Sequence, residues 1–533
     1  MAKFRVFTPD KDSSYRAALQ LLVDKGFAGR LQQQDATLWL AQDRAEAAER
    51  MGWVAFQEAA DETLARAAEH RAKLRDLGCE RIVLCGVGGS SLAAALIADW
   101  ENVELTVLDS THPAQVAEVL AADLHHTAVI IASKSGTTLE TQAQLQSFEQ
   151  AYAAAGISAR ERVTVITDPA TPLESHATQH GYTIFNADPK VGGRFSALTA
   201  FGLVPPTLAG AELGPLLVDA NAAVAKLFAD SAENPALQLA AALFSRIKTE
   251  FAGYVIPTAD EATQLGDWIE QLVAESTGKH GKGFLPIGIP FEQVTDLDLK
   301  AAHTTTVYVP EEPDAAQTRG YAVSGNLAEQ FLTWEIATAA LGWLLEINPF
   351  NQPDVEAAKS AARQIIESTE PPSISCSDSE NLNAADISTA IATADYVALN
   401  VYAPQNEHSR ALLEPLRAQL MATAQAPVAL NYGPRYLHST GQFHKGSAKR
   451  GFFISLLALA APENSATTAG SVTAATAAQS GERNTTEPDY AKIIAAQASG
   501  DAKVLRERGH RVLELSGADL AQLVSQVAAV ISH

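Results

Sequence analysis

The chain has 533 residues and a formal net charge of −23 at pH 7. This length exceeds what one hydrophobic core supports, so we expect two or three domains. The acidic balance disfavours nucleic acid and anionic membranes as partners, since both are bound by basic surfaces. The three cysteines match neither a disulfide framework nor a zinc pattern, and no apolar run reaches membrane-spanning length. We therefore expect a cytoplasmic protein.

The first part of the chain changes from helical patterns to an alternation of strands and helices. Helical spacing predicts a helical N-terminal segment over residues 1–70. A first domain is then predicted over residues 71–215, where helices separate apolar strands at 81–85, 103–109, 128–132, 162–167 and 183–185. This alternation is typical of a doubly wound parallel sheet in a three-layer αβα arrangement. A helical connection over residues 216–252 follows.

A similar rhythm predicts a second α/β domain of the same kind over residues 253–533. Its strands are expected at 253–257, 305–309, 396–402, 428–432 and 511–515. Its helices are expected at 263–277, 327–345, 407–422, 452–459, 490–508 and 517–531. Residues 463–486 are rich in Ala, Ser, Thr and Gly without periodicity, which predicts a flexible excursion.

A polar turn over residues 133–138, here called the anion turn, separates a buried strand from a helical pattern that begins at Leu139. Free N–H groups and the positive end of a helix dipole favour a phosphate there. The alternative is an ordinary helix cap made by Ser and Thr side chains. The residues of the turn are Ser133, Lys134, Ser135, Gly136, Thr137 and Thr138.

Other motifs carry weaker signals when each is taken alone. The stretch over residues 86–91, whose residues 88–90 are here called the glycine turn, is neither a dinucleotide fingerprint nor a Walker A loop. It fits an anion loop and a structural turn equally well. Arg194 follows two glycines, and a surface arginine is the alternative interpretation. Glu275 stands at the end of a helix, where its charge opposes the dipole, and such a conflict favours a function. Lys359 could equally be a lysine on a solvated helix face or part of a functional site. His438 and His444 lack a third ligand nearby, so no metal site is expected.

Together these motifs resemble the glucose-6-phosphate isomerase family, which is built from two sugar-isomerase (SIS) domains. Each motif is weak alone, but the ordered set is specific. The matches are Gly88-Gly89-Ser90, Ser133-Lys134-Ser135-Gly136-Thr137-Thr138-x-Glu140-Thr141, Gly192-Gly193-Arg194-x-Ser196, Glu275-Ser276-x-Gly278-Lys279 and Asn348-Pro349-Phe350-Asn351-Gln352-Pro353-x-Val355-Glu356-x-x-Lys359.

The resemblance implies a role for each matched residue. Glu275 would move a proton between C1 and C2, and Arg194 would stabilise the enediolate charge. Lys359 would assist ring opening, and Gln352 would line the site. Neither a metal nor a cofactor is implied. The phosphate would be held by Gly89, Ser90, Ser133, Ser135, Thr138 and the backbone of Lys134.

The order of motifs departs from the family in one respect. The family's ring-opening histidine comes between the Glu and Lys motifs, whereas the segment around His438 follows Lys359. This order, together with Ala496-Gln497-Ala498-x-Gly500-Asp501, resembles the isomerase half of bifunctional transaldolase–glucose-6-phosphate isomerase proteins. We expect His438 to open the ring, with His444 second and His303 third. In the family this histidine comes from the neighbouring subunit of a dimer. Because the order of motifs differs here, the resemblance does not decide between a homodimer and a monomer.

The function that the resemblance implies is an aldose–ketose isomerase of glycolysis and gluconeogenesis. It would interconvert glucose 6-phosphate and fructose 6-phosphate through a cis-enediolate. One alternative is a non-catalytic SIS-domain phosphosugar-binding protein, which would not need Glu275, Arg194 and Lys359 together. Another is an SIS isomerase of different specificity, for mannose 6-phosphate or an amino sugar. The glucosamine-forming type would need an N-terminal glutaminase domain, and the sequence does not show one.

Overall fold

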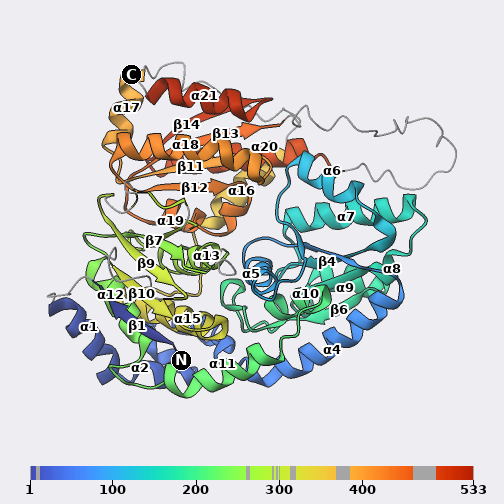
Figure 1. Ribbon diagram of the computed structural model, residues 1–533, viewed down its shortest axis with the longest axis horizontal. Helices are drawn as coiled ribbons and strands as arrows, with labels where there is room; N and C mark the ends of the chain where they lie inside the picture. Colours follow the sequence, from blue (N-terminus) through green and yellow to red (C-terminus); the bar gives the residue numbers. More distant parts are fainter. Residues whose placement is uncertain are drawn as a thin grey trace.

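The structure is a computed structural model that describes residues 2–7, 13–259, 264–290, 293–295, 298, 301–311, 320–367, 384–459 and 488–531. Within these ranges the strands form three sheets, each covered by helices (Figure 1). The expected α/β class with parallel sheets is therefore confirmed. The excursion expected over residues 463–486 lies outside the described residues, and the domain boundaries stay predictions.

The first sheet has the strand order β3-β2-β4-β5-β6, and all of its neighbouring strands are parallel. Alternate residues of β2 face opposite layers, because successive side chains of a strand point to opposite faces. Ile82 and Leu84 pack towards α4, α5 and α10, whereas Val83 and Cys85 pack towards α6, α7 and α9. The three-layer arrangement expected for this region is present. The strands are β2 (Arg81–Cys85), β3 (Thr106–Leu108), β4 (Thr127–Ala132), β5 (Val163–Thr167) and β6 (Thr183–Asn186).

The helices that cover the first sheet are joined to a helical N-terminal part. The covering helices are α4 (Gln57–Asp76), α5 (Leu92–Trp100), α6 (Pro113–Ala121), α7 (Leu139–Ala154), α8 (Ala159–Arg162), α9 (Pro172–His180) and α10 (Ala200–Ala209). The preceding helices are α1 (Ser13–Asp24), α2 (Phe27–Gln32) and α3 (Arg44–Ala48). Residues 13–24, 27–32 and 44–48 are helical as expected, but residues 3–6 of the predicted helical segment form a strand, so the prediction is wrong there.

The second sheet has the order β1-β10-β9-β7-β8, with β1 antiparallel at the edge. Its strands are β1 (Lys3–Val6), β7 (Ala252–Pro257), β8 (Leu285–Gly288), β9 (Thr304–Val309) and β10 (Tyr321–Ser324). One face packs on a helical layer, and the other face shares a core with the third sheet and its helices. The helical layer contains α1, α11 (Gly214–Leu227), α12 (Pro235–Arg246), α13 (Leu265–Thr277) and α15 (Leu327–Leu344).

The third sheet has the order β12-β11-β13-β14, with all neighbours parallel. The C-terminal region therefore holds two sheets, where the sequence predicts one. Alternation of strands and helices does not say which strands pair, because pairing is decided by long-range packing. The elements are β11 (Tyr396–Tyr402), β12 (Val428–Tyr432), β13 (Gly451–Ala458), β14 (Arg511–Gly517), α16 (Val355–Glu367), α17 (Ala384–Ala392), α18 (Glu407–Ala424), α19 (Gly441–Gly446), α20 (Tyr490–Glu507) and α21 (Leu520–Ile531).

The helix predicted over residues 452–459 is wrong, because this segment is strand β13. All eight residues of β13 are buried, and the strand lies between β11 and β14. A central strand of a parallel sheet is covered on both faces and reads as a continuous apolar run. Such a run cannot be distinguished from a buried helix by periodicity alone.

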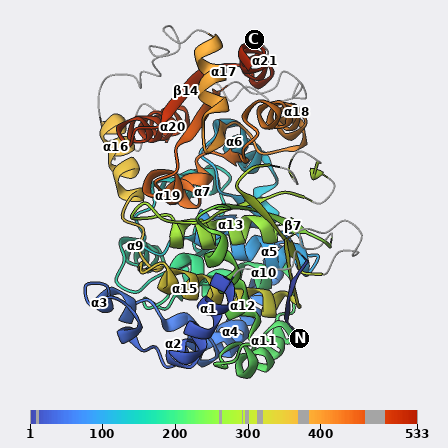
Figure 2. The same cartoon turned by 90° about the vertical axis from the view of Figure 1, so that its left-hand side faces the viewer.

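Helix α13 lies in the middle of the molecule, between α19 and α15, in both views (Figure 1, Figure 2). Its C-terminal end, which carries Glu275, therefore meets segments from all three sheets. None of the helices in the described ranges is both long and apolar enough to cross a membrane.

Candidate active site

The anion turn connects the end of β4 to the first residue of α7. Thr138 is the N-cap residue of α7, but its side chain makes no capping hydrogen bond. Its hydroxyl lies 2.8 Å from the Ser133 hydroxyl instead. Gly136 has φ 65°, and a Cβ there would lie 2.8 Å from Cβ of Thr171, so only glycine fits. The Thr138 side chain therefore does not act as an ordinary helix cap, and a helix N-terminus without a side-chain cap suits an anion.

The Lys134 side chain points away from the anion turn. Its ammonium pairs with Asp168 Oδ2 at 2.5 Å. Burial lowers the pKa of Lys134 and raises that of Asp168. Of Lys134, only the backbone remains for an anion, as the resemblance implies. Ser135 Oγ accepts hydrogen bonds from the backbone N–H and the hydroxyl of Thr137, at 3.3 and 3.0 Å.

The glycine turn, residues 88–90, lies between β2 and α5 and touches two other segments of the site. A Cβ on Gly89 would lie 2.2 Å from the carbonyl carbon of Gly193, next to Arg194. Gly88 has φ 56°, and a Cβ there would lie 2.7 Å from the His438 carbonyl oxygen. Ser90 is half-buried beside them. Glycine is therefore needed here for close backbone approach, and the turn brings Arg194 and His438 together.

Arg194 is buried and held on every nitrogen of its guanidinium. Only 4% of the residue is exposed. Burial lowers its pKa, and the nearby Glu275 carboxylate opposes that effect. This network fixes the cation before any substrate binds. Its hydrogen bonds run to Ser276 Oγ at 2.7 Å, Gln352 Oε1 at 3.0 Å, Pro349 O at 2.7 Å and Asn351 O at 3.0 Å.

Glu275 lies on the last turn of α13, with its carboxylate between two partners. One oxygen is 3.5 Å from Arg194 Nη1, and the other accepts from Gln271 Nε2 at 3.2 Å. The residue is 9% exposed. The guanidinium of Arg194 offsets the unfavourable interaction between this carboxylate and the helix dipole. A buried carboxylate next to a fixed cation suits proton abstraction with stabilisation of the resulting charge.

Lys279 organises the loop that holds Arg194, a role that the sequence analysis did not predict. The residue is fully buried. Its ammonium donates to Asn348 O at 2.9 Å, to Asn351 Oδ1 at 3.0 Å and to the Asn351 carbonyl. Burial lowers its pKa well below the ordinary value, and the nearby Arg194 adds to this effect. Lys279 thus positions the loop carbonyls that in turn position Arg194.

His438 lies at the end of a short 3-10 helix, Arg435–His438, and pairs with a buried acid on α7. Its Nε2 is 2.9 Å from Glu140 Oε1, which also accepts from Gln497 Nε2 at 2.6 Å. Burial raises the pKa of Glu140, but the charge and hydrogen bond of His438 outweigh it and the pKa is lowered. Gln271 Nε2 donates to the His438 carbonyl at 2.7 Å. The same amide therefore joins His438 to Glu275.

The other two histidines considered for ring opening lie elsewhere. His444 is 1% exposed in the core of the third sheet, with Nδ1 3.0 Å from the Tyr396 hydroxyl. Burial lowers its pKa well below the ordinary value. His303 is at the surface, with Nδ1 2.9 Å from Thr249 O. Of the three, the structure brings only His438 to Glu140 and Gln271.

Lys359 lies on α16 at the margin of the site. Its ammonium pairs with Glu356 at 2.9 Å, and 36% of its side chain is exposed. Its charge contributes to lowering the pKa of Glu140, which places it within electrostatic reach of the His438 pair. Lys359 therefore belongs to the surroundings of the site without touching Glu275 or Arg194 in the described structure.

Three polar residues complete the site without having been predicted: Glu140, Gln271 and Gln497. A signal was present for each of them. Glu140 stands inside the matched anion-turn motif, and Gln271 precedes Glu275 by four residues, which places both side chains on one helix face. Gln497 belongs to the singled-out segment 496–501. Its contact with Glu140 joins residues that are far apart in sequence, and spacing does not reveal such a pair.

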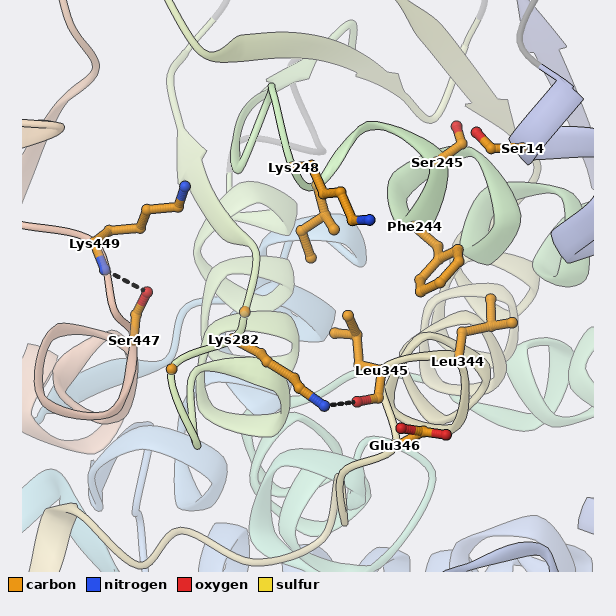
Figure 3. Close-up of a pocket in the computed structure, with 13 residues that line it drawn as sticks. Ser14, Phe244, Ser245, Lys248, Lys282, Leu344, Leu345, Glu346, Ser447 and Lys449 are labelled. Atoms are coloured by element: carbon orange, nitrogen blue, oxygen red, sulfur yellow. Dashed lines mark hydrogen bonds between the residues drawn. The ribbon is translucent and has the colours of Figure 1, made fainter.

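A cavity of about 620 Å³ lies apart from these residues, beside the loop that follows α13 (Figure 3). Its wall includes three lysines, Lys248, Lys282 and Lys449, and the ammonium of Lys282 donates to the Leu345 carbonyl at 2.5 Å. None of the predicted site residues lines it. The cavity is therefore not the site assembled by Glu275, Arg194 and His438.

Comparison with known proteins places this arrangement in one family. A family model described as phosphoglucose isomerase matches residues 75–283. A glucose-6-phosphate isomerase of Mycoplasmopsis pulmonis is 30% identical over 359 residues, which cover 54% of this chain and 83% of that protein. A probable glucose-6-phosphate isomerase of Haloarcula marismortui is 29% identical over 344 residues, which cover 54% of this chain and 78% of that protein.

Solved structures agree with the sequence matches. A hypothetical protein of Thermus thermophilus superposes with TM-score 0.59 at 26% identity, over 69% of this chain and 100% of its own. A glucose-6-phosphate isomerase of Chlamydia trachomatis superposes with TM-score 0.54 at 19% identity, over 68% of this chain and 88% of its own, which shows a shared fold. With a relative at 30% identity matched over most of its length, this chain belongs to the glucose-6-phosphate isomerase family.

Proposed function

We propose that this chain interconverts glucose 6-phosphate and fructose 6-phosphate. The observation that carries the proposal is the buried pair of Glu275 and Arg194, 3.5 Å apart. Gln271 joins Glu275 to His438, and His438 bonds Glu140, which follows the anion turn. Aldose–ketose exchange needs a carboxylate base and a fixed positive charge near the oxyanion. Family membership supports the same activity.

Glu275 is the base in this proposal. Its carboxylate takes the proton from C2 of open-chain glucose 6-phosphate, the C2–H electrons form the C1–C2 double bond, and the carbonyl oxygen at C1 becomes the enediolate oxygen. Returning the proton to C1 and moving the hydroxyl proton from O2 to O1 gives fructose 6-phosphate. Arg194 stabilises the enediolate charge, and its fixed hydrogen bonds mean that little reorganisation is needed during the reaction.

The anion turn binds the phosphate in this proposal. The hydroxyls of Ser133, Ser135 and Thr138 and the backbone of Lys134 precede the first turn of α7, and Gly89 and Ser90 of the glycine turn would also bind the phosphate. The helix N-terminus adds its dipole. Anchoring the phosphate holds C1 and C2 beside Glu275, so the proton transfer becomes effectively intramolecular.

Ring opening is assigned to His438, with Glu140 as its positioning residue and Lys359 as a nearby charge. Opening the ring requires a proton on the ring oxygen and loss of the O1 hydroxyl proton. A histidine hydrogen-bonded to a carboxylate is suited to carry that proton. Gln352 lines the site through its bond to Arg194.

We also propose that the enzyme works in the cytoplasm and that, as a homodimer or a monomer, each chain supplies its own ring-opening histidine, because His438 bonds Glu140 of the same chain. The order of motifs, with His438 after Lys359, supports a relationship with the isomerase half of bifunctional transaldolase–glucose-6-phosphate isomerase proteins.

A coupled assay tests the proposed activity. Fructose 6-phosphate is supplied, and glucose 6-phosphate formation is followed through an NADP-dependent dehydrogenase. Parallel reactions offer mannose 6-phosphate and glucosamine 6-phosphate in place of fructose 6-phosphate, and loss of each substrate is followed directly by NMR, because these reactions do not release glucose 6-phosphate to the dehydrogenase. We expect turnover that is fastest with fructose 6-phosphate. Binding of fructose 6-phosphate without turnover would contradict the proposal and favour a phosphosugar sensor, whereas faster turnover of another sugar phosphate would favour a different isomerase specificity.

A further inference from the structure

Two histidines and a glutamate gather on the outer helices of the first sheet, away from Glu275 and Arg194. Glu149 lies on α7, and His176 and His180 lie one turn apart on α9. One ligand atom from each residue lies within 4.8 Å of the other two. The side chains of Glu149 and His176 are 26% and 35% exposed, and His180 is exposed, so ions in solvent can reach the cluster.

The hydrogen bonds of the cluster already orient His180 and Glu149 as ligands. His180 Nδ1 lies 2.9 Å from the His176 carbonyl, which can only accept, so Nδ1 carries the hydrogen and Nε2 keeps the lone pair. A backbone carbonyl bonded to one ring nitrogen is the usual partner of a metal-binding histidine. The Tyr182 hydroxyl donates to Glu149 Oε1 at 2.6 Å and orients the carboxylate in the same way.

The rings of His176 and His180 stack with centroids 4.1 Å apart. His176 Nε2 is 2.6 Å from Glu149 Oε1, a hydrogen bond in this structure. Ligands of a tetrahedral zinc ion are about 3.4 Å apart, because Zn–N and Zn–O bonds are about 2.0–2.1 Å. A side-chain movement of less than about 1 Å would separate His176 Nε2 and Glu149 Oε1 to that spacing.

We propose that Glu149, His176 and His180 bind a divalent transition-metal ion such as Zn²⁺. Two imidazoles and one carboxylate form a ligand set that zinc and its neighbours prefer over Mg²⁺ or Ca²⁺. The exposed side of His180 leaves room for water as a fourth ligand. This site is independent of the proposed isomerase activity and was not predicted from the sequence, because Glu149 and the histidines belong to different helices.

The bound ion would fasten α7 to α9. The first residues of both helices lie at or beside the anion turn. Thr138, the last residue of the turn, is the N-cap of α7, and Thr171, the N-cap of α9, packs against Gly136 of the turn. An ion that binds only the folded arrangement stabilises it by mass action. The metal should therefore raise the melting temperature and hold the helices that support the anion turn.

Zn²⁺ titration of the tag-free full chain, with a chromophoric chelator as competitor, tests the site. We expect one tight equivalent in the wild type, a Tm increase of a few degrees, and at least tenfold weaker binding in His180→Ala and Glu149→Gln. Tyr182→Phe should weaken binding about tenfold, since it removes only the hydrogen bond to Glu149.

His126→Ala is the matched control, because His126 is an exposed histidine 2.7 Å from the Asp123 carboxylate. It should bind Zn²⁺ as the wild type does. Co²⁺ should give the visible absorption of a tetrahedral site in the wild type and not in His180→Ala. Equal Zn²⁺ affinity in the wild type and His180→Ala would overturn the proposal, as would loss of the tight equivalent in His126→Ala.

Discussion

The guanidinium of Arg194 lies 3.5 Å from the carboxylate of Glu275, and both residues are buried. The pair joins a turn after the first sheet to the end of α13 in the helical layer of the second sheet. Removing either partner leaves the other charge buried without compensation, which lowers the stability of the folded protein. The pair therefore couples the arrangement of the sheets to the chemistry that we propose.

Replacing the hydroxyls of the anion turn should mainly weaken substrate binding. We expect Ser133→Ala and Thr138→Ala each to raise KM about tenfold with little change in kcat, since each removes a hydrogen bond to a charged phosphate. Steady-state kinetics with fructose 6-phosphate provides the measurement. Ser175→Ala, which removes a hydroxyl of α9 bonded to the Thr171 carbonyl, serves as the control. A fall in kcat at unchanged KM would exclude a role of these hydroxyls in phosphate binding.

Replacing His438 should separate ring opening from proton transfer. We expect His438→Ala to slow turnover of the cyclic substrate by about 10² or more, and to change exchange of the open-chain form far less. Glu140→Gln should show the same selective loss to a smaller degree, because it removes the charge that positions His438. His303→Ala should leave both rates unchanged. Equal losses on both substrate forms in His438→Ala would remove His438 from ring opening.

Activity should not depend on association between chains. Because His438 pairs with Glu140 of the same chain, we expect constant specific activity from micromolar to low nanomolar protein. Light scattering or sedimentation at the same concentrations would report the oligomeric state. A drop in specific activity that follows dissociation of a dimer would show that a partner chain completes the site.

His70 should make the protein sensitive to acid. It is buried on α4, with Nε2 2.8 Å from the Thr164 hydroxyl, and burial lowers its pKa from 6.5 to about 4. As pH falls below 6.5 the unfolded chain binds this proton first, so stability is lost between pH 6.5 and about 4. The full loss is about 3 kcal/mol.

Urea unfolding at several pH values measures this dependence. His70→Gln should make it less steep between pH 6.5 and 4, whereas the exposed His125→Gln should leave it unchanged. If His70→Gln loses stability with falling pH as steeply as the wild type, other groups must carry the acid sensitivity.

Much of the fold could be predicted because strands and helices of an α/β protein leave strong local patterns. The strand at 81–85 and the start of helix α7 at Leu139 were predicted at their observed positions. Strand β13 was missed because a strand buried on both faces has no alternation to reveal it. The division of the C-terminal strands into two sheets depends on long-range pairing, and local patterns do not contain it.

The candidate site, like the fold, could be predicted only in part from the sequence. Glu275 and Arg194 were predicted from short motifs, and the structure brings them together. Glu140 stands inside the anion-turn motif and Lys279 inside the Glu275 motif. The role of Glu140 depends on its contact with His438, and the role of Lys279 on its contacts with the 348–352 loop. Such contacts join segments more than 60 residues apart, so they became visible only in the folded structure.

The most direct test of the proposed activity measures exchange of the C2 hydrogen of glucose 6-phosphate with solvent. In deuterated water, the wild type should exchange this hydrogen while it forms fructose 6-phosphate. Glu275→Gln should lose exchange and isomerisation together by about 10³ while still binding the sugar phosphate.

Glu270→Gln on the same helix is the control for that measurement. Burial raises the pKa of Glu270 to about 8, so glutamine resembles the protonated form present at pH 7, and wild-type rates are expected. Loss of C2 exchange in Glu275→Gln, with exchange retained in Glu270→Gln, is the predicted result. Exchange in Glu275→Gln at the wild-type rate would contradict the account.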